Sequence, residues 1–527
     1  MVRHAILMMA GTLVSRVLGL VREVVTAAFF GATARLDAFN VAYTLANLAR
    51  QLVAEGALSA AFVPVFSQAL KTSRSRALSL ARQAMTVLIV AASAVTLVGI
   101  LAAPLLTTLI APGFDSKSAT LATQLTRMMF PFLFVISLAA LAMGTLNSLG
   151  SFFVPALAPA FSNLTFILTA PLFVSRWGVH GLALSVLCGG TAHFLTQWLW
   201  GVRLGAVLRP ERPDLKDPDL RRMMALFLPY AAGLSLNQLN PVISRMLGSF
   251  LQEGSISVLN YANRILQLPL GLFVIAISQA VLPQLSRASG VEDFLVTLRS
   301  ALRFALFIVL PASLGLILIS TPFVHVLFVR GAFGEQAWHA TSLSLSLSIL
   351  GLPGMACSTV VMRALYSLSM PRQAFIVTLF SVASTALFSL ALMFPMDYAG
   401  LALAPSIAFT LSGLLGLSYI RKKLGQPLHI LSWSWLGKSS LALVVTGLAV
   451  WGCSLLRPYD PSAAFHTRAL WCLWVPACGT IAYAAATLAL RCDEWRWVAE
   501  ALGLRKGPAD PSSRAQEERD NIPSSEK

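Results

Sequence analysis

Long apolar runs recur along the whole chain and constrain its fold more than any other feature. Residues 85–111, 439–456 and 469–490 are three such runs without Asp, Glu, Lys or Arg. A helix of about 20 apolar residues crosses the hydrocarbon core of a bilayer, whereas barrel strands alternate polar and apolar residues. Only 12% of the residues are charged, about half the share usual in soluble proteins. The runs therefore predict an all-α, polytopic integral membrane protein.

The apolar runs and the breaks between them predict about fourteen transmembrane helices. The predicted spans cover residues 5–29, 36–66, 83–111, 121–147, 153–174, 179–202, 223–250, 256–285, 301–328, 338–368, 373–394, 399–420, 436–456 and 468–490.

The basic residues divide unequally between the two sets of loops. With the N-terminus inside, the outward-facing segments contain only Arg35, Lys117, Arg176, Arg330, Arg457 and Arg468, and most of the other basic residues face inward. Cytoplasmic loops are enriched in Lys and Arg. We therefore expect a protein of the bacterial inner membrane with both termini on the cytoplasmic side. On this interpretation, the basic residues behind the net charge of +17 orient the protein in the membrane and contact anionic lipid. They do not indicate a nucleic-acid partner.

Short motifs recur at a nearly constant spacing of about 219 residues, as expected of an internal duplication. Pro64 and Pro283 occupy matching motifs, as do Met143 and Met362. The sequence GLAL at 181–184 returns at 400–403. The first twelve spans therefore form two parallel six-helix repeats, with two extra helices at the C-terminus.

This duplication predicts a division of the chain into a first lobe, a linker, a second lobe, two extra helices and a tail. The predicted boundaries are 1–202, 203–222, 223–422, 423–490 and 491–527. The binding site of such a transporter lies between the halves. The polar tail is expected to be disordered.

Ionised residues inside the predicted spans indicate a water-accessible cavity. Each buried Arg costs about 2.5 to 3.5 kcal/mol on insertion scales, so such residues usually face a cavity or a partner. Arg16 and Glu23 share a helix face, with Arg22 beside them. Two further polar stripes have helical spacing: Asp37, Asn40, Thr44, Asn47, Gln51 and Glu55, next to Arg50; and Asn260, Asn263, Arg264 and Gln267.

Two interpretations of these charges remain open at this stage. Pairs such as Arg16 with Glu23 or Arg50 with Glu55 could simply hold helices together. Taken together, however, Arg16, Arg22, Arg50 and Arg264 leave an excess of positive charge, which favours an anionic cargo such as a phosphate. We interpret three other arginines within or near spans, Arg127, Arg245 and Arg363, as interfacial or packing residues.

No pattern in the chain indicates catalysis, a metal site or a cofactor. The HExxH, Walker A and GxSxG motifs are absent. The six Cys residues have no metal-ligand spacing. We therefore expect a transporter that binds no cofactor, not an enzyme.

Three segments resemble the MurJ (MviN) family of bacterial lipid II flippases. They are SRVLGLVRE at 15–23, LDAFNVAYTLANLARQLVAEGALSAAFVPVF at 36–66 and YANRILQLPLGLF at 261–273. The resemblance extends from about residue 5 to about residue 490 and implies two six-helix lobes around a cationic cavity. It also implies that the two added helices form an apolar groove for the polyprenyl tail.

The resemblance also implies which residues act. The family's essential arginines correspond to Arg16, Arg22, Arg50 and Arg264, and its acidic positions correspond to Asp37 and Glu55. The sequence departs from the family at Glu23, where relatives often carry Asp. It also lacks a clear acidic counterpart to the sodium ligands proposed in some members, so sodium coupling is not expected.

The resulting hypothesis is a flippase that moves lipid II, the lipid-linked peptidoglycan precursor, between leaflets by alternating access. The four arginines would hold the diphosphate, and Asn47, Gln51, Asn260 and Asn263 would meet sugar or peptide. We expect a monomer surrounded by membrane lipids, with cell-wall synthesis proteins as candidate partners. The alternatives are a multidrug/ion antiporter or polysaccharide-lipid exporter of the same superfamily, and a non-transporting membrane scaffold.

Overall fold

The computed structural model describes residues 2–51, 58–235, 238–495 and 497, and this part of the chain is helical without strands. The helices up to the first long linker are α1 (Val2–Phe30), α2 (Ala34–Arg50), α3 (Ser59–Thr72), α4 (Arg74–Leu101), α5 (Ala103–Ile110), α6 (Ser116–Met129), α7 (Pro131–Ser148), α8 (Phe153–Trp177) and α9 (Val179–Arg203). The all-α prediction is confirmed.

The second half of the chain begins with α10 after the linker and ends with α21. Its helices are α10 (Pro218–Ser235), α11 (Leu239–Gly248), α12 (Ser255–Pro269), the π-helix η3 (Leu270–Ile275), α13 (Ala276–Arg287), α14 (Val291–Leu318), α15 (Ser320–Phe328), α16 (Glu335–Ile349), α17 (Leu352–Ser367), α18 (Pro371–Met396), α19 (Tyr398–Leu424), α20 (Trp433–Leu456) and α21 (Phe465–Ala489).

Eleven helical segments in the described residues are long and apolar enough to cross a membrane. Each coincides with one predicted span. The other three predicted spans correspond to α1, to α2 with α3, and to α10 with α11. The last two of these contain the undescribed residues 52–57 and 236–237.

Prolines explain several breaks within the spans. Pro104 and Pro131 lie in the first turns of α5 and α7, and Pro353 lies in the first turn of α17. Proline lacks a backbone N–H and favours the first turn of a helix, where that donor would have no intrahelical partner. Several spans are therefore built from two helices in succession.

The backbone confirms the duplication at the turn between the fifth and sixth helix of each repeat. Gly178 between α8 and α9 has φ 54° and ψ −132°, and Asp397 between α18 and α19 has φ 53° and ψ −135°. This conformation is rare for a residue with a side chain. The two positions are 219 residues apart, the spacing of the sequence motifs.

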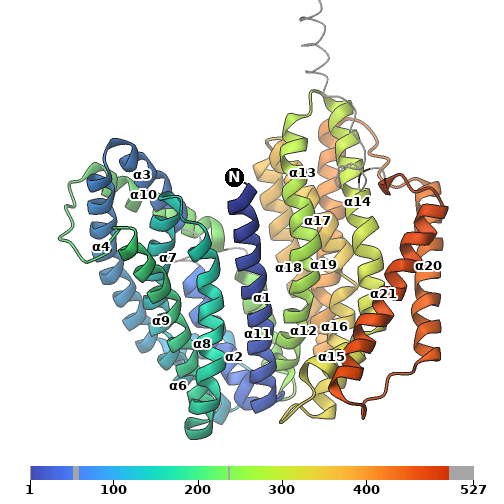
Figure 1. The fold of residues 1–527 in the computed structure, drawn as a ribbon, viewed down its shortest axis with the longest axis horizontal. Coiled ribbons are helices and arrows are strands. Elements are labelled where there is room, and N and C mark those ends of the chain that lie inside the picture. The colour runs from blue at the N-terminus through green and yellow to red at the C-terminus, as the bar shows by residue number, and fades with distance from the viewer. Residues whose placement is uncertain (1, 52–57, 236–237, 496, 498–527) are drawn as a thin grey trace, which may run out of the picture.

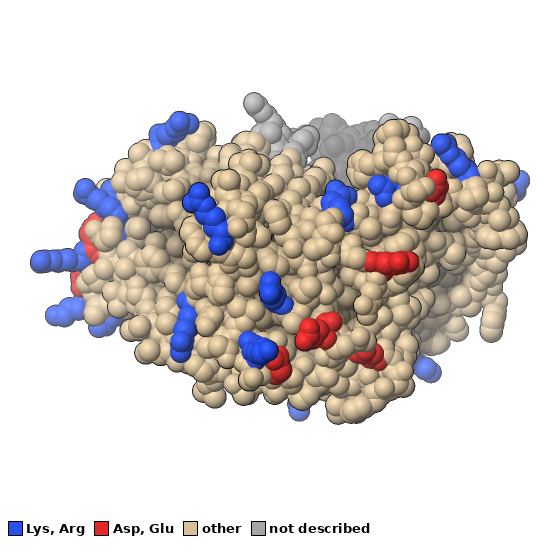
Figure 2. Space-filling view, turned by 90° about the horizontal axis from the view of Figure 1, so that it is seen from below, with Lys and Arg blue, Asp and Glu red and all other residues tan. Residues whose placement is uncertain are grey.

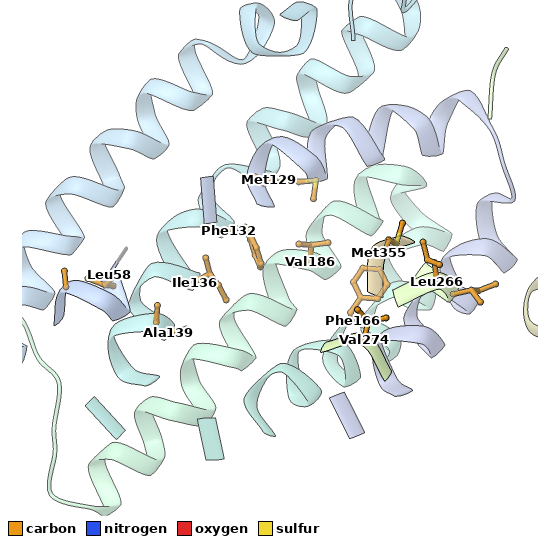
Figure 3. Close-up of a cluster of buried hydrophobic side chains, with 14 of the residues drawn as sticks. Leu58, Met129, Phe132, Ile136, Ala139, Phe166, Val186, Leu266, Val274 and Met355 are labelled. Carbon is orange, nitrogen blue, oxygen red and sulfur yellow. The ribbon is translucent and has the colours of Figure 1, made fainter. Parts of the chain in front are cut away.

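The helices form two bundles that approach each other at one end and diverge toward the end where α1 begins (Figure 1). The first bundle contains α2 to α9, and the second contains α12 to α21, with α1 and α11 between them. Buried side chains continue from one bundle to the other: Figure 3 shows Phe132 and Ile136 of the first bundle and Leu266 and Met355 of the second.

One helix lies apart from the bundle to which the repeat assigns it. Although α10 follows the linker, it packs against α3 and α4 of the first bundle (Figure 1). Met223 and Phe227 of α10 meet Leu58 and Ala84 there, so apolar contact explains the placement. The chain passes to the second bundle between α10 and α11, beyond the predicted lobe boundary at 222/223.

Candidate functional site

A polar cavity of about 350 Å³ lies between the two bundles. Its walls come from α1, α2, α8, α9, α11 and α12 and include Arg22, Glu23, Thr26, Asn40, Tyr43, Thr44, Asn47, Arg50, Gln51, Phe166, Gln238, Arg245, Asn260, Asn263, Arg264 and Gln267. Seven of the ten predicted site residues therefore surround one space: Arg22, Asn47, Arg50, Gln51, Asn260, Asn263 and Arg264.

The helical period places these side chains in the wall. Asn40, Thr44, Asn47 and Gln51 of α2 and its C-cap repeat every three or four residues, so they share one face. Asn260, Asn263 and Gln267 form the same pattern on α12. The two polar stripes seen in the sequence therefore face each other across the cavity.

Arg22 is fixed by an acid and two aromatic rings. Its Nη2 lies 2.9 Å from Glu23 Oε1, and its guanidinium carbon lies 5.6 Å from the centre of the Tyr43 ring and 5.5 Å from that of Phe166. A guanidinium over an aromatic face gains cation–π attraction and loses side-chain freedom. Arg22 therefore holds a fixed position in the wall.

Two glycines allow arginines to approach the opposite helix closely. The Arg264 guanidinium lies against the backbone of Gly19 in α1, where an added Cβ would clash with it. The Arg16 guanidinium lies against Gly271 in η3 in the same way. Arg16 itself does not line the cavity. These contacts join α1 to the α12–η3 segment and place Arg16 beside the cavity wall.

Arg50 and Arg245 bring further positive charge to the cavity. Arg50 Nε donates to Asn47 Oδ1 at 2.8 Å. Arg245 of α11 donates to Thr44 Oγ1 at 3.2 Å and to Asn260 Oδ1 at 3.0 Å. The prediction that Arg245 is only an interfacial or packing residue is therefore wrong. Gln238, Pro241 and Arg245 all line the cavity, but α11 is too short for its spacing alone to indicate this face.

Asp37 lies outside the cavity and joins the two bundles instead. Its carboxylate accepts hydrogen bonds from Gly254 N at 2.7 Å, Ser257 N at 2.7 Å and Ser257 Oγ at 2.6 Å. These are the first backbone donors of α12, where a carboxylate is stabilised by unpaired N–H groups and by the helix dipole. The last predicted site residue, Glu55, lies outside the described residues.

Other bonds between the bundles surround Asp37, and we call this end of the molecule the gate end. Tyr261 Oη donates to Gly31 O at 2.9 Å, Asn40 Nδ2 to Ser257 Oγ at 3.1 Å, and Ala332 N to Ala28 O at 2.8 Å. Figure 2 views the molecule from this end and shows a continuous surface with scattered charges. The bundles are therefore closed together on the gate side of the cavity.

The cavity is electrostatically unbalanced. Arg22, Arg50, Arg245 and Arg264 line it, and Glu23 is the one carboxylate among its described lining residues. One guanidinium about 4 Å from a phosphate oxygen contributes on the order of 4 kcal/mol at an effective dielectric constant near 20. No group of three or more His, Cys, Asp or Glu side chains in the described part of the chain could hold a metal ion. The wall suits an anion.

The cavity continues into the second bundle. A further space of about 400 Å³ shares Arg245, Asn260, Asn263 and Gln267 with the first and extends between α11, α12, α17 and α19. Its wall combines amides and hydroxyls with apolar side chains such as Met355. An amphiphilic head group larger than a diphosphate would find both kinds of contact here.

An apolar groove of about 470 Å³ lies on the other side of α12. It is lined by α12, η3, α14, α15, α20 and α21, including Leu268, Phe307, Gly315 and Tyr483. Ile265 and Leu268 of α12 face the groove, whereas Asn263 and Arg264 face the cavity. A single helix therefore separates the polar space from the apolar one.

Comparison with known proteins gives a consistent assignment. The family profile described as lipid II flippase MurJ matches residues 26–467. The chain is 33% identical over 467 residues to the "Lipid II flippase MurJ" of Burkholderia cenocepacia, covering 85% of this chain and 89% of the relative. It is 32% identical over 508 residues to the "Probable lipid II flippase MurJ" of Vibrio cholerae, covering 93% and 96%.

Solved structures extend the likeness to three dimensions. A "Lipid II flippase MurJ, inward closed conformation" has a TM-score of 0.76 and 26% identity, covering 92% of this chain and 99% of that one. An inward-facing MATE-family multidrug transporter of the MOP superfamily has a TM-score of 0.66 at 15% identity, covering 80% and 98%, which supports the fold alone. With its arginine-lined cavity, its duplicated bundles and these matches, the chain belongs to the lipid II flippase MurJ family.

Proposed function

We propose that this protein moves the head group of lipid II from the inner to the outer leaflet of the bacterial cytoplasmic membrane, as a transporter and not as an enzyme. One observation carries the proposal: arginines from both bundles surround a single cavity that has one described carboxylate in its wall. Lipid II carries a diphosphate, and arginine binds phosphate oxygens through two N–H groups at once. The activity would supply precursor for peptidoglycan synthesis and so maintain cell shape.

In this mechanism the diphosphate lies among Arg22, Arg50 and Arg264, with Arg16 supporting the wall from its place against Gly271. Asn47, Gln51, Asn260 and Asn263 contact the sugar or peptide, whose bulk extends into the space beside α17 and α19. The polyprenyl tail stays in the apolar groove between α14 and α20–α21. The head group and the tail would thus lie on opposite faces of α12.

Transport then requires the two lobes to rock. We assign the gate end to the outer face and both termini to the cytoplasm, as the distribution of basic residues favours. Loading takes place while the bonds of Asp37 to Gly254 and Ser257 hold the gate end closed. Breaking those bonds opens the outer side. The lobes correspond to 1–202 and 223–422, except that α10 moves with α3 and α4.

The test is head-group translocation by the purified full-length protein in liposomes. Arg264→Gln removes one cavity charge, and we expect at least about a thirtyfold loss of rate, the size of a lost charge-assisted contact. Arg127→Gln is the matched control because Arg127 is exposed on α6 away from the cavity. A wild-type rate in a folded Arg264→Gln variant would reject the proposed role.

The alternatives differ in what they predict. A multidrug/ion antiporter would move cationic amphiphiles and need acidic coupling groups, and the arginine excess of the cavity disfavours both. A non-transporting scaffold would tolerate loss of every cavity charge. Depleting the protein in living bacteria and measuring the lipid-linked precursor distinguishes these hypotheses. Accumulation of lipid II is the result expected from the flippase hypothesis alone.

A further inference from the structure

A second group of arginines lies at the gate end of the apolar groove. Arg330 follows α15, Arg457 begins the loop between α20 and α21, and Arg468 lies in the first turn of α21. These three are half of the six basic residues that the sequence assigns to the outer face. Arginine is uncommon on that face of a membrane protein, so their concentration at one place needs an explanation.

Hydrogen bonds link Arg468 to a neutral histidine. Arg468 Nη1 lies 3.2 Å from His325 Nδ1, and Tyr459 Oη lies 2.5 Å from the same nitrogen. A guanidinium can only donate, so Nδ1 must carry a lone pair and the imidazole is neutral. Burial raises the pKa of Tyr459 to about 12. Its phenol therefore stays protonated and remains a hydrogen-bond donor.

The guanidiniums of this group have more N–H donors than the hydrogen bonds described for them. Arg330 Nη2 donates to Val326 O at 2.6 Å, and its guanidinium carbon lies 5.6 Å from the Phe465 ring centre. Arg468 Nη1 also donates to Pro461 O at 3.3 Å, and Arg468 Nε is buried without a hydrogen-bond partner. Burial, and then the positive charge of Arg468, lower the pKa of Arg330.

Within the described residues, Arg330 and Arg468 have no carboxylate as an ion-pair partner. Asp460 lies in the same loop, and its carboxylate accepts from Ser462 N at 2.8 Å and Ser462 Oγ at 2.6 Å. These hydrogen bonds, and then the positive charge of Arg468, lower the pKa of Asp460, but its carboxylate is not an ion-pair partner of that guanidinium. Both guanidiniums therefore keep N–H groups that can donate to an anion, whereas the single O–H of Tyr459 is already shared with His325 Nδ1.

The groove leads directly to this group. Ile319, Phe323 and Val450 line the groove, and they belong to the same apolar cluster as Tyr459 and Trp471. Arg330 lies seven positions after Phe323, and Arg468 lies eight positions before Pro476, which is also in the groove wall. At 1.5 Å per helical residue, Arg468 lies about 12 Å from Pro476 along α21.

We propose that Arg330 and Arg468, the latter positioned by His325 and Tyr459, form an exit site that binds the diphosphate of the translocated lipid at the outer surface while its tail still occupies the groove. This inference rests on the proposed function. Phe465 lies under the Arg330 guanidinium, and aromatic residues are enriched at the level of lipid head groups. The site would keep the head group from returning to the cavity before the lipid leaves.

The experiment maps where a diphosphate lipid binds. The full-length protein in phosphatidylcholine nanodiscs is incubated with a polyprenyl diphosphate that carries a photoreactive group beside the diphosphate, and crosslinked peptides are identified by mass spectrometry. We expect two sets of crosslinks, one on the cavity helices and one within 457–471. Arg330→Gln with Arg468→Gln should reduce the second set at least about fivefold and leave the first unchanged.

Matched variants keep the result interpretable. Lys117→Gln with Arg176→Gln removes the same charge from exposed sites on the same face of the first bundle and should change neither set. Arg330→Lys with Arg468→Lys keeps the charge but loses the bidentate geometry, so an intermediate loss is expected. Thermal unfolding of each variant confirms that it is folded.

Two results would overturn the exit site. One is an unchanged crosslink at 457–471 in the folded Arg330→Gln, Arg468→Gln variant. The other is loss of that crosslink when phosphatidylglycerol is added at the same mole fraction as the probe, because the group would then bind any lipid phosphate. Arg264→Gln should remove only the cavity crosslinks. If it does not, the cavity assignment fails while the 457–471 result still decides the exit site.

Discussion

The cavity and the groove differ in almost every property, although both are bounded by α12. The cavity is lined by both bundles and has four arginines in its wall. The groove is lined by the second bundle with α20 and α21, and its described lining residues include no charged side chain. The difference suggests that each space holds one part of an amphiphile, and that substitutions on the two faces of α12 should have separable effects.

The equivalent surface of the first bundle shows why the larger groove lies beside the second bundle. In each repeat an arginine of the third span holds the loop after the sixth: Arg82 Nε donates to Val207 O at 3.1 Å and Arg299 Nε to Leu428 O at 2.6 Å. The next helix, α10 or α20, then covers α4 or α14. Under α10 only about 180 Å³ remains, against about 470 Å³ beside α20 and α21.

The largest effect that separates the two spaces is expected for Arg22→Gln. Loss of a fixed guanidinium should slow transport about 100-fold for any lipid diphosphate, because one contact to the phosphate is worth several kcal/mol before desolvation. The loss should be the same for short and long tails, measured by translocation assays with a series of prenyl chain lengths. A loss that grows with tail length would contradict the separation.

A smaller effect is expected when the groove is filled. An added Cβ at Gly315 meets nothing within 4 Å, so Gly315→Trp should occupy the groove without displacing its wall. Transport of a long-tailed lipid should fall about tenfold because apolar area of the tail is no longer buried, and a short-tailed lipid should be spared. Val98→Trp at the equivalent, exposed position of α4 is the control. Equal losses for both tails would refute the groove assignment.

Asp37→Asn should change the transport of the long-tailed and the short-tailed lipid to the same extent. The amide keeps the shape but weakens three hydrogen bonds to α12, which shifts the balance toward the outward-open state by about 1 to 3 kcal/mol. Spin-label distances across the gate end measure the shift. Asn163→Asp, which alters a polar side chain of α8 bonded to Ser15 O of α1, should leave those distances unchanged. Unchanged distances in Asp37→Asn would show that Asp37 does not hold the gate end closed.

The smallest effect is expected for Gly19→Ala. The new methyl group would displace the Arg264 guanidinium, but this is the end of a flexible side chain that can move aside. We expect a two- to fivefold loss of transport, on the order of 1 kcal/mol, with no dependence on tail length. An effect as large as that of Arg264→Gln would mean that the helix contact itself, and not the position of the charge, is what matters.

The polar walls could be predicted from the sequence, but their tertiary partners could not. Helical spacing is a local property, so Asn47, Gln51, Asn260 and Asn263 were correctly placed on facing stripes. Asp37 belongs to the same stripe by spacing, yet it caps α12 because a distant helix begins beside it. Arg245 lies on a short helix after an interrupted span, where periodicity has too few residues to indicate a face.

The packing of α10 shows the same limit at a larger scale. The repeat assigns it to the second lobe, but the Arg82 bond holds the preceding loop against α4, and Arg76 binds Asp217 at 2.8 Å. These contacts return the chain to the first bundle before it crosses. Such long-range bonds leave no periodic trace in a single sequence.

The most direct test of the central claim is a structure of the protein bound to lipid II, determined by cryo-electron microscopy. The account predicts diphosphate density within hydrogen-bonding distance of Arg22 and Arg264, with tail density beside Gly315 on the other face of α12. Diphosphate density outside the cavity, with Arg22 and Arg264 unchanged and uncontacted in the loaded state, would contradict it.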